Sequence, residues 1–583
     1  MKLESLSNEL FFELFECLDG VHLIRAFHDL NFRFNKLLFD HFRQFQFDFR
    51  SISKRDFDFI CQQYLPLIIN RVTSLSISDN EETSDLFDHL LTYGFTLHQF
   101  TCLKSLSFFH KKLNKILIES IYLIQLTHLK LIQCYYNNHE DELVDLINTI
   151  WRLPKLTHCY LDFEYAYGRL FNRLDVISSS IECISSPWMQ CSSKDFQNLL
   201  EHTPRLRHLD AICYTVTRND LLKTIVPTIT KLHVIFISAS ETIMINLFQS
   251  MPNLTKLTVQ LFIYHLNGHQ WKEIIVNYLP NIKLFRFSMN FQSSIHNADT
   301  EKQLNELLDT FRTSFWLDEN HWYVRCHWDS QDIIQNAHIY TLPHTFPYCF
   351  DRTRKPRLKL NGWCRSTCPN DQELWSYDYV RESPLTREIE DWALSPMSFP
   401  KINTLQIVLP THESIWSIIP TLNYLTSLTI YIFGNNAQFQ LQALLDRAPH
   451  LYSLAIRNDS TFQFLQWNIR SVSIRRLDLM QWETENHLYC NAATCFTLIN
   501  SLWRHQCEIL LIDIENRSII IDLINRMSNL RSLTVRCYDD ELSNSHLSSA
   551  HDDFIDWLKI CLPSKCSIRR HKSDINIWIN KEN

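Results

Sequence analysis

Six short apolar segments each carry a pair of positions, two residues apart, that holds at least one lysine, arginine or histidine and alternates with residues typical of a core. The pairs are His128/Lys130, His158/Tyr160, His208/Asp210, Lys231/His233, Lys256/Thr258 and Leu284/Arg286. Side chains alternate between the two faces of a strand, so these pairs are expected to share one face. All of them except Thr258 and Leu284 are predicted binding residues. Because spaced cations form charge-assisted hydrogen bonds to anions, the predicted ligand is an acidic or phosphorylated protein segment.

Two other interpretations of these pairs stay open. A strand face of chance composition, in contact with water, would show similar side chains in a chain that holds 26 histidines. The histidines could instead bind a metal ion, although neighbouring strands alone do not establish ligand geometry.

A cluster of cysteines and one histidine has the spacing of a metal site. It comprises Cys326, His327, Cys349, Cys364 and Cys368. A single C-x₃-C pair is a weak zinc signal, and loop cysteines are the simpler interpretation. No metal or cofactor is therefore predicted. The run RTRKPRLK at 352–359 carries five cations, which suits a nuclear-import signal, a contact for an acidic partner or a solvated loop.

Glycine is too scarce for the phosphate-binding and nucleophile motifs of common enzymes. The six glycines stand alone, so neither a P-loop, a G-x-G-x-x-G nor a G-x-S-x-G can be formed. We therefore expect no enzymatic activity. The alternative is an enzyme carried by residues 292–400, which would need a bound metal or cofactor.

Charge and cysteine usage favour an intracellular protein. The net charge of −8 argues against nucleic-acid and membrane partners, which usually attract basic proteins. The start MKLESLSNELFFELF does not resemble a signal peptide, and the sequence has no run of 18 apolar residues. Scattered cysteines suggest reduced thiols packed in a core. The expected location is the cytoplasm, with the nucleus as a second compartment.

A repeat positions the paired residues. The pattern Leu-x-x-Leu-x-Leu returns about every 23 to 33 residues, and helical segments such as 139–151 and 192–202 lie between its copies. Proline often follows these helices, as at Pro154 and Pro204. The strand centres are predicted at Leu75, Leu106, Leu129, Cys159, Ile184, Leu209, Leu232, Leu257 and Phe285. This pattern predicts an α/β leucine-rich-repeat solenoid, a horseshoe in which the paired residues line the concave face.

The period is interrupted once. Residues 292–400 contain alternating aromatic segments at 321–328 and 338–346, which predict a β-rich insertion. Strand centres resume at Leu405, Leu428, Leu454, Leu477, Leu510 and Leu533. A helix at 552–562 and a strand near Ile575–Ile579 are expected to end the stack. The predicted domains are residues 1–45, a helical module; 46–291, a first repeat array; 292–400, the insertion; and 401–583, a second array with its cap.

The first 45 residues predict three short helices. Leu6, Leu10, Leu14 and Leu18 step by four along one helix face, with Ser7 as the expected cap and Gly20 as the expected end. A second helix is expected to hold Leu23, Phe27 and Leu30, and a third Phe34, Leu37 and Leu38.

This module resembles an F-box. The residues that carry the resemblance are Leu6-Ser7-Asn8-Glu9-Leu10, Leu14-Phe15, Leu18, Leu23 and Leu30-Asn31-Phe32-Arg33-Phe34. The chain departs from the F-box pattern at Ser7, His22, Asn31 and Phe34. An F-box ahead of leucine-rich repeats is typical of the F-box/leucine-rich-repeat family.

The resemblance implies a substrate-recruiting adaptor of an SCF-type (Skp1–cullin–F-box) E3 ubiquitin ligase, which acts in ubiquitin-dependent protein degradation. Its implied partners are a Skp1-like adaptor, through it a cullin, and a protein substrate on the repeats. The implied adaptor-binding residues are Leu6, Glu9, Leu10, Leu14, Phe15, Leu18, Leu23, Leu30 and Phe34. The alternatives are a repeat scaffold unconnected with ubiquitin, and helices that only cap the stack.

Overall fold

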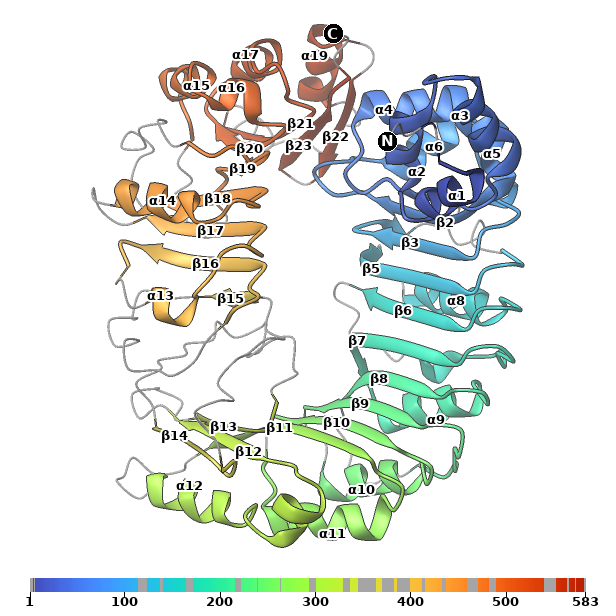
Figure 1. The fold of residues 1–583 in the computed structure, drawn as a ribbon, viewed down its shortest axis with the longest axis vertical. Helices are drawn as coiled ribbons and strands as arrows, with labels where there is room; N and C mark the ends of the chain where they lie inside the picture. Colours follow the sequence, from blue (N-terminus) through green and yellow to red (C-terminus); the bar gives the residue numbers. More distant parts are fainter. Residues whose placement is uncertain are drawn as a thin grey trace. The chain divides into compact units, whose positions relative to one another are not determined.

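Parallel strands alternate with helices along most of the chain, as the computed structural model in Figure 1 shows. The structure describes residues 4, 6–113, 123–136, 140–163, 171–214, 222–237, 240–262, 264–292, 300–328, 336–343, 363–369, 382–384, 399–411, 415–432, 437–458, 470–481, 489–538, 552–563, 566–571 and 573–580. The chain forms two compact units, Met1–Met289 and Asn290–Lys581. Each is a mixed α/β assembly with a large parallel sheet.

The strands of unit 1 follow their order in the sequence. The sheet order is β1-β2-β3-β5-β6-β7-β8-β9-β10-β11, with every printed pair parallel. The strands are β1 (Phe45–Asp48), β2 (Val72–Ser78), β3 (Ser105–Phe109), β4 (Lys112–Leu113, beside β5), β5 (His128–Tyr136), β6 (His158–Phe163), β7 (Cys183–Cys191), β8 (His208–Cys213), β9 (Lys231–Phe236), β10 (Lys256–Leu261) and β11 (Leu284–Gln292).

Helices connect these strands and cover one face of the sheet. They are α4 (Lys54–Phe59), η3 (Ile60–Tyr64), α5 (Leu65–Ile68), η4 (Ile69–Arg71), α6 (Leu86–Thr92), η5 (Leu97–Gln99), α8 (Glu140–Trp151), η6 (Phe171–Arg173), α9 (Ser193–Glu201), α10 (Glu241–Gln249) and α11 (Gly268–Tyr278). Figure 1 shows α8 to α11 along one face, while the opposite face carries none of these four helices. We call this opposite side the helix-free face.

The predicted strand centres lie in one buried row. From Leu75 to Phe285, each predicted centre is the Cα partner of the next, so the row crosses the sheet without a shift. These side chains are buried under the helices. The predicted strand centres from Leu75 to Phe285 are confirmed. A slip of one residue would move these apolar side chains to the other face of the sheet, so their burial fixes the register.

A ladder of threonine hydroxyls marks the start of several strands. The hydroxyl of Thr127 donates to the carbonyl of Lys104 at 3.0 Å, and that of Thr157 donates to the carbonyl of Thr127 at 3.1 Å. The pattern recurs at Thr230 (3.4 Å) and Thr255 (3.0 Å). Each bond joins one strand entry to the preceding strand, so these threonines add side-chain bonds to the backbone ladder.

The two named helical segments are confirmed as α8 and α9. Ser192 caps α9, because its hydroxyl accepts from Asp195 N while the Asp195 carboxylate accepts from Ser192 N at 2.9 Å. This reciprocal pair satisfies two amides that a helix start leaves free. In the part of the chain that the structure describes, no helix is both long and apolar enough to cross a membrane.

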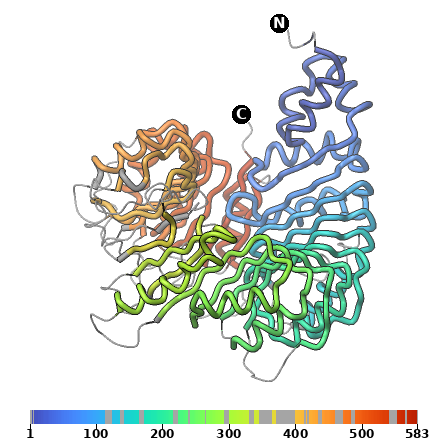
Figure 2. Tube along the Cα trace, turned by 60° about the horizontal axis from the view of Figure 1, so that its bottom comes forward, coloured from blue at the N-terminus to red at the C-terminus, as the bar shows by residue number. Residues whose placement is uncertain are grey.

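The N-terminal module contains α1 (Asn8–Glu16), α2 (Gly20–Phe27), α3 (Phe32–Lys36) and the π-helical turn η2 (Leu37–His41). Figure 2 shows these helices beyond the first strands, at one end of unit 1. Ser7 is the N-cap residue of α1, as predicted, but its side chain accepts no backbone hydrogen bond there.

Three expectations for this module were wrong. Leu6 and Leu18, expected on one face of the first helix, lie outside α1. Gly20 does not end α1, which ends with Cys17 at the C-cap; it is the first residue of α2, and Asp19 caps that helix. Leu30 lies beyond α2, which ends at Phe27. The Asp19 carboxylate accepts from Val21 N at 2.8 Å and from Asp48 N at 2.6 Å. The module is thereby joined to β1, a strand that the leucine pattern missed.

Unit 2 begins with a helix and antiparallel strands. Its first elements are α12 (Thr300–Asp309), η7 (Phe315–Glu319), β12 (Val324–Trp328), β13 (Asn336–Thr341) and β14 (Trp363–Ser366). The strand β12 pairs with β13 and β14, antiparallel in both cases. The aromatic segments at 321–328 and 338–346 therefore contain strands, as expected, with a helix before them.

The remainder of unit 2 repeats the parallel arrangement. Its strands are β15 (Glu382–Pro384), β16 (Thr404–Leu409), β17 (Ser427–Ile432), β18 (Ser453–Asn458), β19 (Arg476–Asp478), β20 (Ile509–Ile514), β21 (Ser532–Cys537), β22 (Ser567–His571) and β23 (Asp574–Trp578). Its helices are α13 (Ile415–Ile418), α14 (Ala437–Asp446), α15 (Ala492–Ile499), α16 (Trp503–Gln506), α17 (Ser518–Arg526) and α19 (Asp553–Cys561). The predicted centres from Leu405 to Leu533 are again Cα partners, and antiparallel β23 and β22 end the sheet.

Candidate functional site

The register of β5 to β11 places the predicted binding residues in two rows. The first row contains His128, His158, Cys183, His208, Lys231, Lys256 and Leu284, and the second Lys130, Tyr160, Ser185, Asp210, His233, Thr258 and Arg286. Their neighbours along each strand are buried beneath the helices, so strand alternation puts both rows on the helix-free face. All ten predicted residues come together, and β7 adds Cys183 and Ser185.

Two histidines stack at one end of the first row. The rings of His128 and His158 lie with centroids 4.5 Å apart and planes inclined by 12°. The Nδ1 atoms lie 2.9 Å from the hydroxyls of Thr127 and Thr157, respectively. Each hydroxyl donates its proton to a carbonyl, so in the neutral ring it accepts a hydrogen bond from Nδ1–H. Burial, with His158 and Lys130 nearby, lowers the pKa of His128.

The single carboxylate of the two rows is held by its neighbours. Asp210 accepts from Ser185 Oγ at 2.8 Å, and its Oδ1 lies 2.9 Å from His233 Nδ1. Burial opposes ionisation, but His233, Ser185 and His208 favour the carboxylate and together hold the pKa of Asp210 below its ordinary value. Asp210 is therefore an ionised carboxylate that is engaged by side chains of the same face.

The lysines of this face project without acidic partners. Lys231 and Lys256 are Cα partners on adjacent strands, and both are exposed. Arg286 lies one strand farther on, two residues along from the partner of Lys256. Among the residues that the structure describes, none forms an ion pair with these three side chains or with Lys130. Like charges on neighbouring strands repel each other, so this corner carries an uncompensated positive potential.

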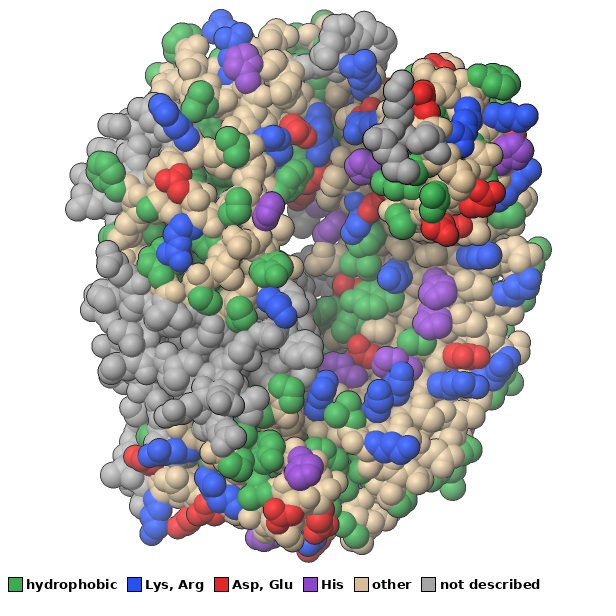
Figure 3. All heavy atoms as spheres, in the orientation of Figure 1, with side chains coloured by type: hydrophobic (Ala, Val, Ile, Leu, Met, Phe, Trp, Pro, Cys, Tyr) green, Lys and Arg blue, Asp and Glu red, His purple; other side chains and the backbone are tan. Residues whose placement is uncertain are grey.

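A second acid lies just outside the two rows. Glu182, the residue before β7, is 3.4 Å from Arg205 and 4.0 Å from Arg207. These arginines offset its charge. Figure 3 shows histidine, lysine and arginine side chains gathered over the middle strands of unit 1.

The N-terminal module has an aromatic core and exposed aliphatic side chains. Ring contacts of 5.0 to 6.3 Å join Phe11 to Phe15, Phe27 and Phe34. Of the predicted adaptor-binding residues, Phe15, Leu23 and Phe34 are buried, Leu6 and Leu18 are half-buried, and Glu9, Leu10, Leu14 and Leu30 are exposed. The exposed fractions of Leu10 and Leu14 are 49% and 38%, and Phe32 nearby reaches 82%.

Arg33 holds the start of α1 against α3. Its guanidinium donates to the carbonyl of Leu6 at 2.7 Å and to Asn8 Oδ1 at 2.7 Å. Its charge also lies over the Phe11 ring, 5.3 Å from the centroid. These bonds fix α1, so Leu10 and Leu14 stay on its outer side.

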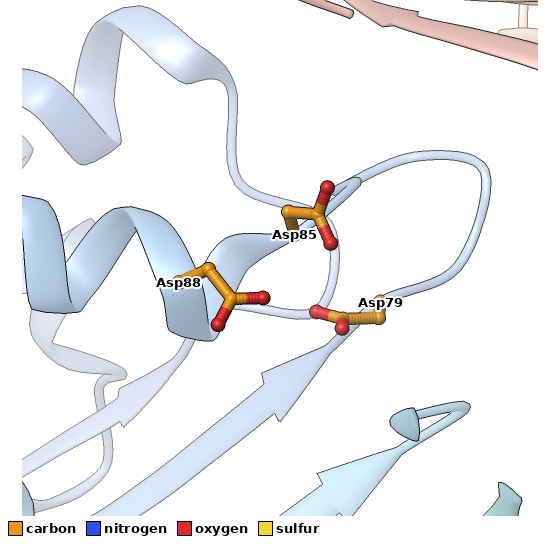
Figure 4. A group of neighbouring side chains, drawn as sticks. All are labelled: Asp79, Asp85 and Asp88. Atoms are coloured by element: carbon orange, nitrogen blue, oxygen red, sulfur yellow. The ribbon is translucent and has the colours of Figure 1, made fainter. Parts of the chain in front are cut away.

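Three aspartates of unit 1 lie close enough together to suggest a cation site. Asp79, Asp85 and Asp88 offer carboxylate oxygens within 4.8 Å of one another (Figure 4). The ammonium of Lys111 lies 2.7 Å from Asp79 and 2.9 Å from Asp88. Burial opposes its charge, but the two carboxylates outweigh burial and raise the pKa of Lys111. Lys111 thus already supplies the cation for this cluster.

The cysteine cluster of unit 2 is only partly assembled. Cys364 Sγ lies 3.7 Å from His327 Nε2, across the paired strands β14 and β12. Burial raises the pKa of Cys326, so its thiol stays protonated. Cys349 and the basic run 352–359 lie outside the described residues. Within the described part, the cysteines and His327 form no group of three metal ligands.

A scan against protein-family models gives no match to this chain, and a search of curated proteins finds none either.

Proposed function

We propose that this chain is a substrate-recruiting adaptor of an SCF-type ubiquitin ligase, in which the parallel sheets are leucine-rich-repeat solenoids and the N-terminal module is an F-box. It brings a protein substrate to a Skp1-like adaptor and a cullin, and it performs no chemistry of its own. The helix-free face of unit 1 holds the substrate.

The observation that carries this proposal is the exposure of Leu10 and Leu14 on a helix that already has a buried aromatic stripe. A module that only capped the sheet would present a polar outer side to water. Exposed aliphatic side chains on a small module instead suit a protein contact. Burial of each such leucine contributes roughly 1.5–3 kcal/mol to association.

The sheets support the repeat assignment. Most neighbouring parallel strands are joined through a described helical segment, and a single row of core residues crosses every parallel pair from β2 to β11. One repeat cannot bury its apolar face alone, whereas stacked neighbouring repeats bury it continuously.

The test is co-purification of the full-length chain with a recombinant Skp1-type adaptor. We expect Leu10→Asp/Leu14→Asp to abolish capture, while far-ultraviolet circular dichroism and the unfolding midpoint stay close to those of the natural protein. The matched control is Ile225→Asp/Val276→Asp, which adds the same charge at exposed positions of the repeats. The control should retain capture.

Each contrary result has a distinct meaning. Capture that survives Leu10→Asp/Leu14→Asp would overturn the assignment of α1 as the docking element. A natural protein that captures no adaptor would overturn the ubiquitin-ligase function and leave a repeat scaffold as the interpretation.

A further inference from the structure

The two rows of the helix-free face carry more positive charge than any neighbouring acid offsets. Lys130, Lys231, Lys256 and Arg286 stand against the single Asp210, which its own neighbours already engage. The chain as a whole is acidic, with a net charge of −8. The cations are therefore concentrated on this face against the trend of the molecule, as expected of a surface that attracts an anionic partner.

The spacing of the cations indicates the shape of that partner. The strands β5 and β11 are six steps apart in the sheet, which at about 4.8 Å per step places Lys130 and Arg286 on strands roughly 29 Å apart. An extended segment of about nine residues spans that length, at roughly 3.3 Å per residue. A single small anion would contact only one end of the two rows.

The chemistry of the side chains favours carboxylates over a phosphate. Phosphate groups are commonly bound by several arginines, whose planar forks match their oxygens. Here one arginine accompanies three lysines that lie on separate strands. Lysine ammonium groups act as point charges and suit a series of separate carboxylates.

From these observations we propose that the helix-free face of unit 1 binds an extended protein segment rich in aspartate and glutamate. The segment crosses the strands from β5 to β11, and its carboxylates contact Lys130, Lys231, Lys256 and Arg286. The inference rests on the proposed function in one respect, namely that the bound segment belongs to a recruited substrate.

Binding is measured by fluorescence anisotropy with the full-length chain and a labelled peptide of alternating glutamate and serine, about ten residues long. Alternation places every carboxylate on one side of an extended chain. The comparison peptides replace glutamate by glutamine, one of them carrying a single central phosphoserine. We expect only the glutamate peptide to bind, and more weakly as salt is added.

The decisive variant is Lys231→Glu/Lys256→Glu, for which we expect at least about a tenfold loss of affinity, since two charge-assisted contacts become repulsive. The matched control is Lys194→Glu/Lys223→Glu, which makes the same charge change at exposed positions on the helix-covered side. The control should bind like the natural protein.

Three outcomes would overturn the inference: no binding of the glutamate peptide, equal losses in variant and control, or binding of the phosphoserine peptide alone. The assay contains no adaptor, so its failure is distinct from failure of the proposed ligase function. Unfolding midpoints of both variants close to the natural value exclude loss of fold as the cause.

Discussion

His128 and His158 stack on neighbouring strands, with ring centroids 4.5 Å apart. The stack places two imidazoles beside Lys130 on the face proposed to bind acidic segments. Protonation of either ring adds positive charge to this face, but burial and the neighbouring cations lower the pKa of His128. Burial also lowers the pKa of His208 on β8, with smaller opposing and reinforcing effects from its charged neighbours.

The affinity for the glutamate peptide is expected to rise as the pH falls from about 7.5 to about 5.5. Peptide carboxylates remain ionised throughout, since their ordinary pKa is about 4.3, whereas His128 and His208 gain protons as the pH falls. Because the pKa of His128 is lowered, much of the increase in affinity is expected at pH values below 6.5, the ordinary pKa of histidine. The anisotropy titration is repeated at each pH.

His128→Gln/His158→Gln should reduce this pH dependence, with His208 left to contribute the remainder, and leave the affinity at pH 7.5 nearly unchanged. An affinity that does not change with pH in the natural protein would contradict a role for the stacked rings in binding.

His89 makes the fold itself sensitive to acid. Burial, with Lys54 nearby, lowers the pKa of His89 to about 4, from 6.5. The unfolded chain therefore binds more protons than the folded chain between these values, and the free energy of unfolding falls as the pH drops from about 6.5 towards 4. Chemical denaturation at several pH values should show this loss, and His89→Gln should reduce it. A His89→Gln profile parallel to that of the natural protein would be evidence against the assignment.

Gly20 and Gly94 are required for different reasons. A Cβ atom on Gly20 would come within 2.6 Å of the buried Phe47 ring, whereas Gly94 has open space but a φ of +83°. We expect Gly20→Ala to lower the free energy of unfolding by about 1–3 kcal/mol through overpacking. Gly94→Ala should cost roughly 1–2 kcal/mol through backbone strain.

Asparagine separates the two causes. Asparagine tolerates the left-handed backbone, so Gly94→Asn should be milder than Gly94→Ala, whereas Gly20→Asn should be at least as damaging as Gly20→Ala. Urea denaturation measures all four variants. Equal effects of alanine and asparagine at both positions would refute the distinction.

The strand register was predictable because it depends on one buried residue in each repeat. Leu106, Leu129 and Leu209 were identified from the leucine spacing alone and are Cα neighbours of the predicted partners. The paired residues of the helix-free face followed from alternation. The ladder of Thr127 and Thr157 was not predicted, although threonine follows leucine in both copies of the pattern. Its hydrogen bonds join neighbouring strands, and the spacing within one repeat does not indicate them.

The N-terminal module was less predictable because α1 has two apolar stripes. Leu10 and Leu14 step by four, and so do Phe11 and Phe15 one position later. Spacing alone does not tell which stripe is buried; packing against Phe27 and Phe34 selects the phenylalanines. β1 was missed because its apolar residues alternate over only four positions.

Lys111 is expected to be essential for the stability of unit 1, because it neutralises a buried carboxylate. The Asp79 side chain is fully buried and lies 2.7 Å from the Lys111 ammonium, which also lies 5.6 Å from the centre of the Phe87 ring. Lys111→Met keeps much of the apolar volume but leaves Asp79 without this cation. We expect a loss of about 3–5 kcal/mol in the free energy of unfolding.

Two further variants test this explanation. Lys111→Met/Asp79→Asn should recover a large part of the loss, since no charge remains buried at that position. Lys112→Met removes the same charge from the adjacent half-buried residue, which forms neither of the ion pairs of Lys111, and should cost much less than Lys111→Met. All three are compared by urea denaturation. If Lys111→Met were no more harmful than Lys112→Met, the ion pair with Asp79 would not be what stabilises this loop.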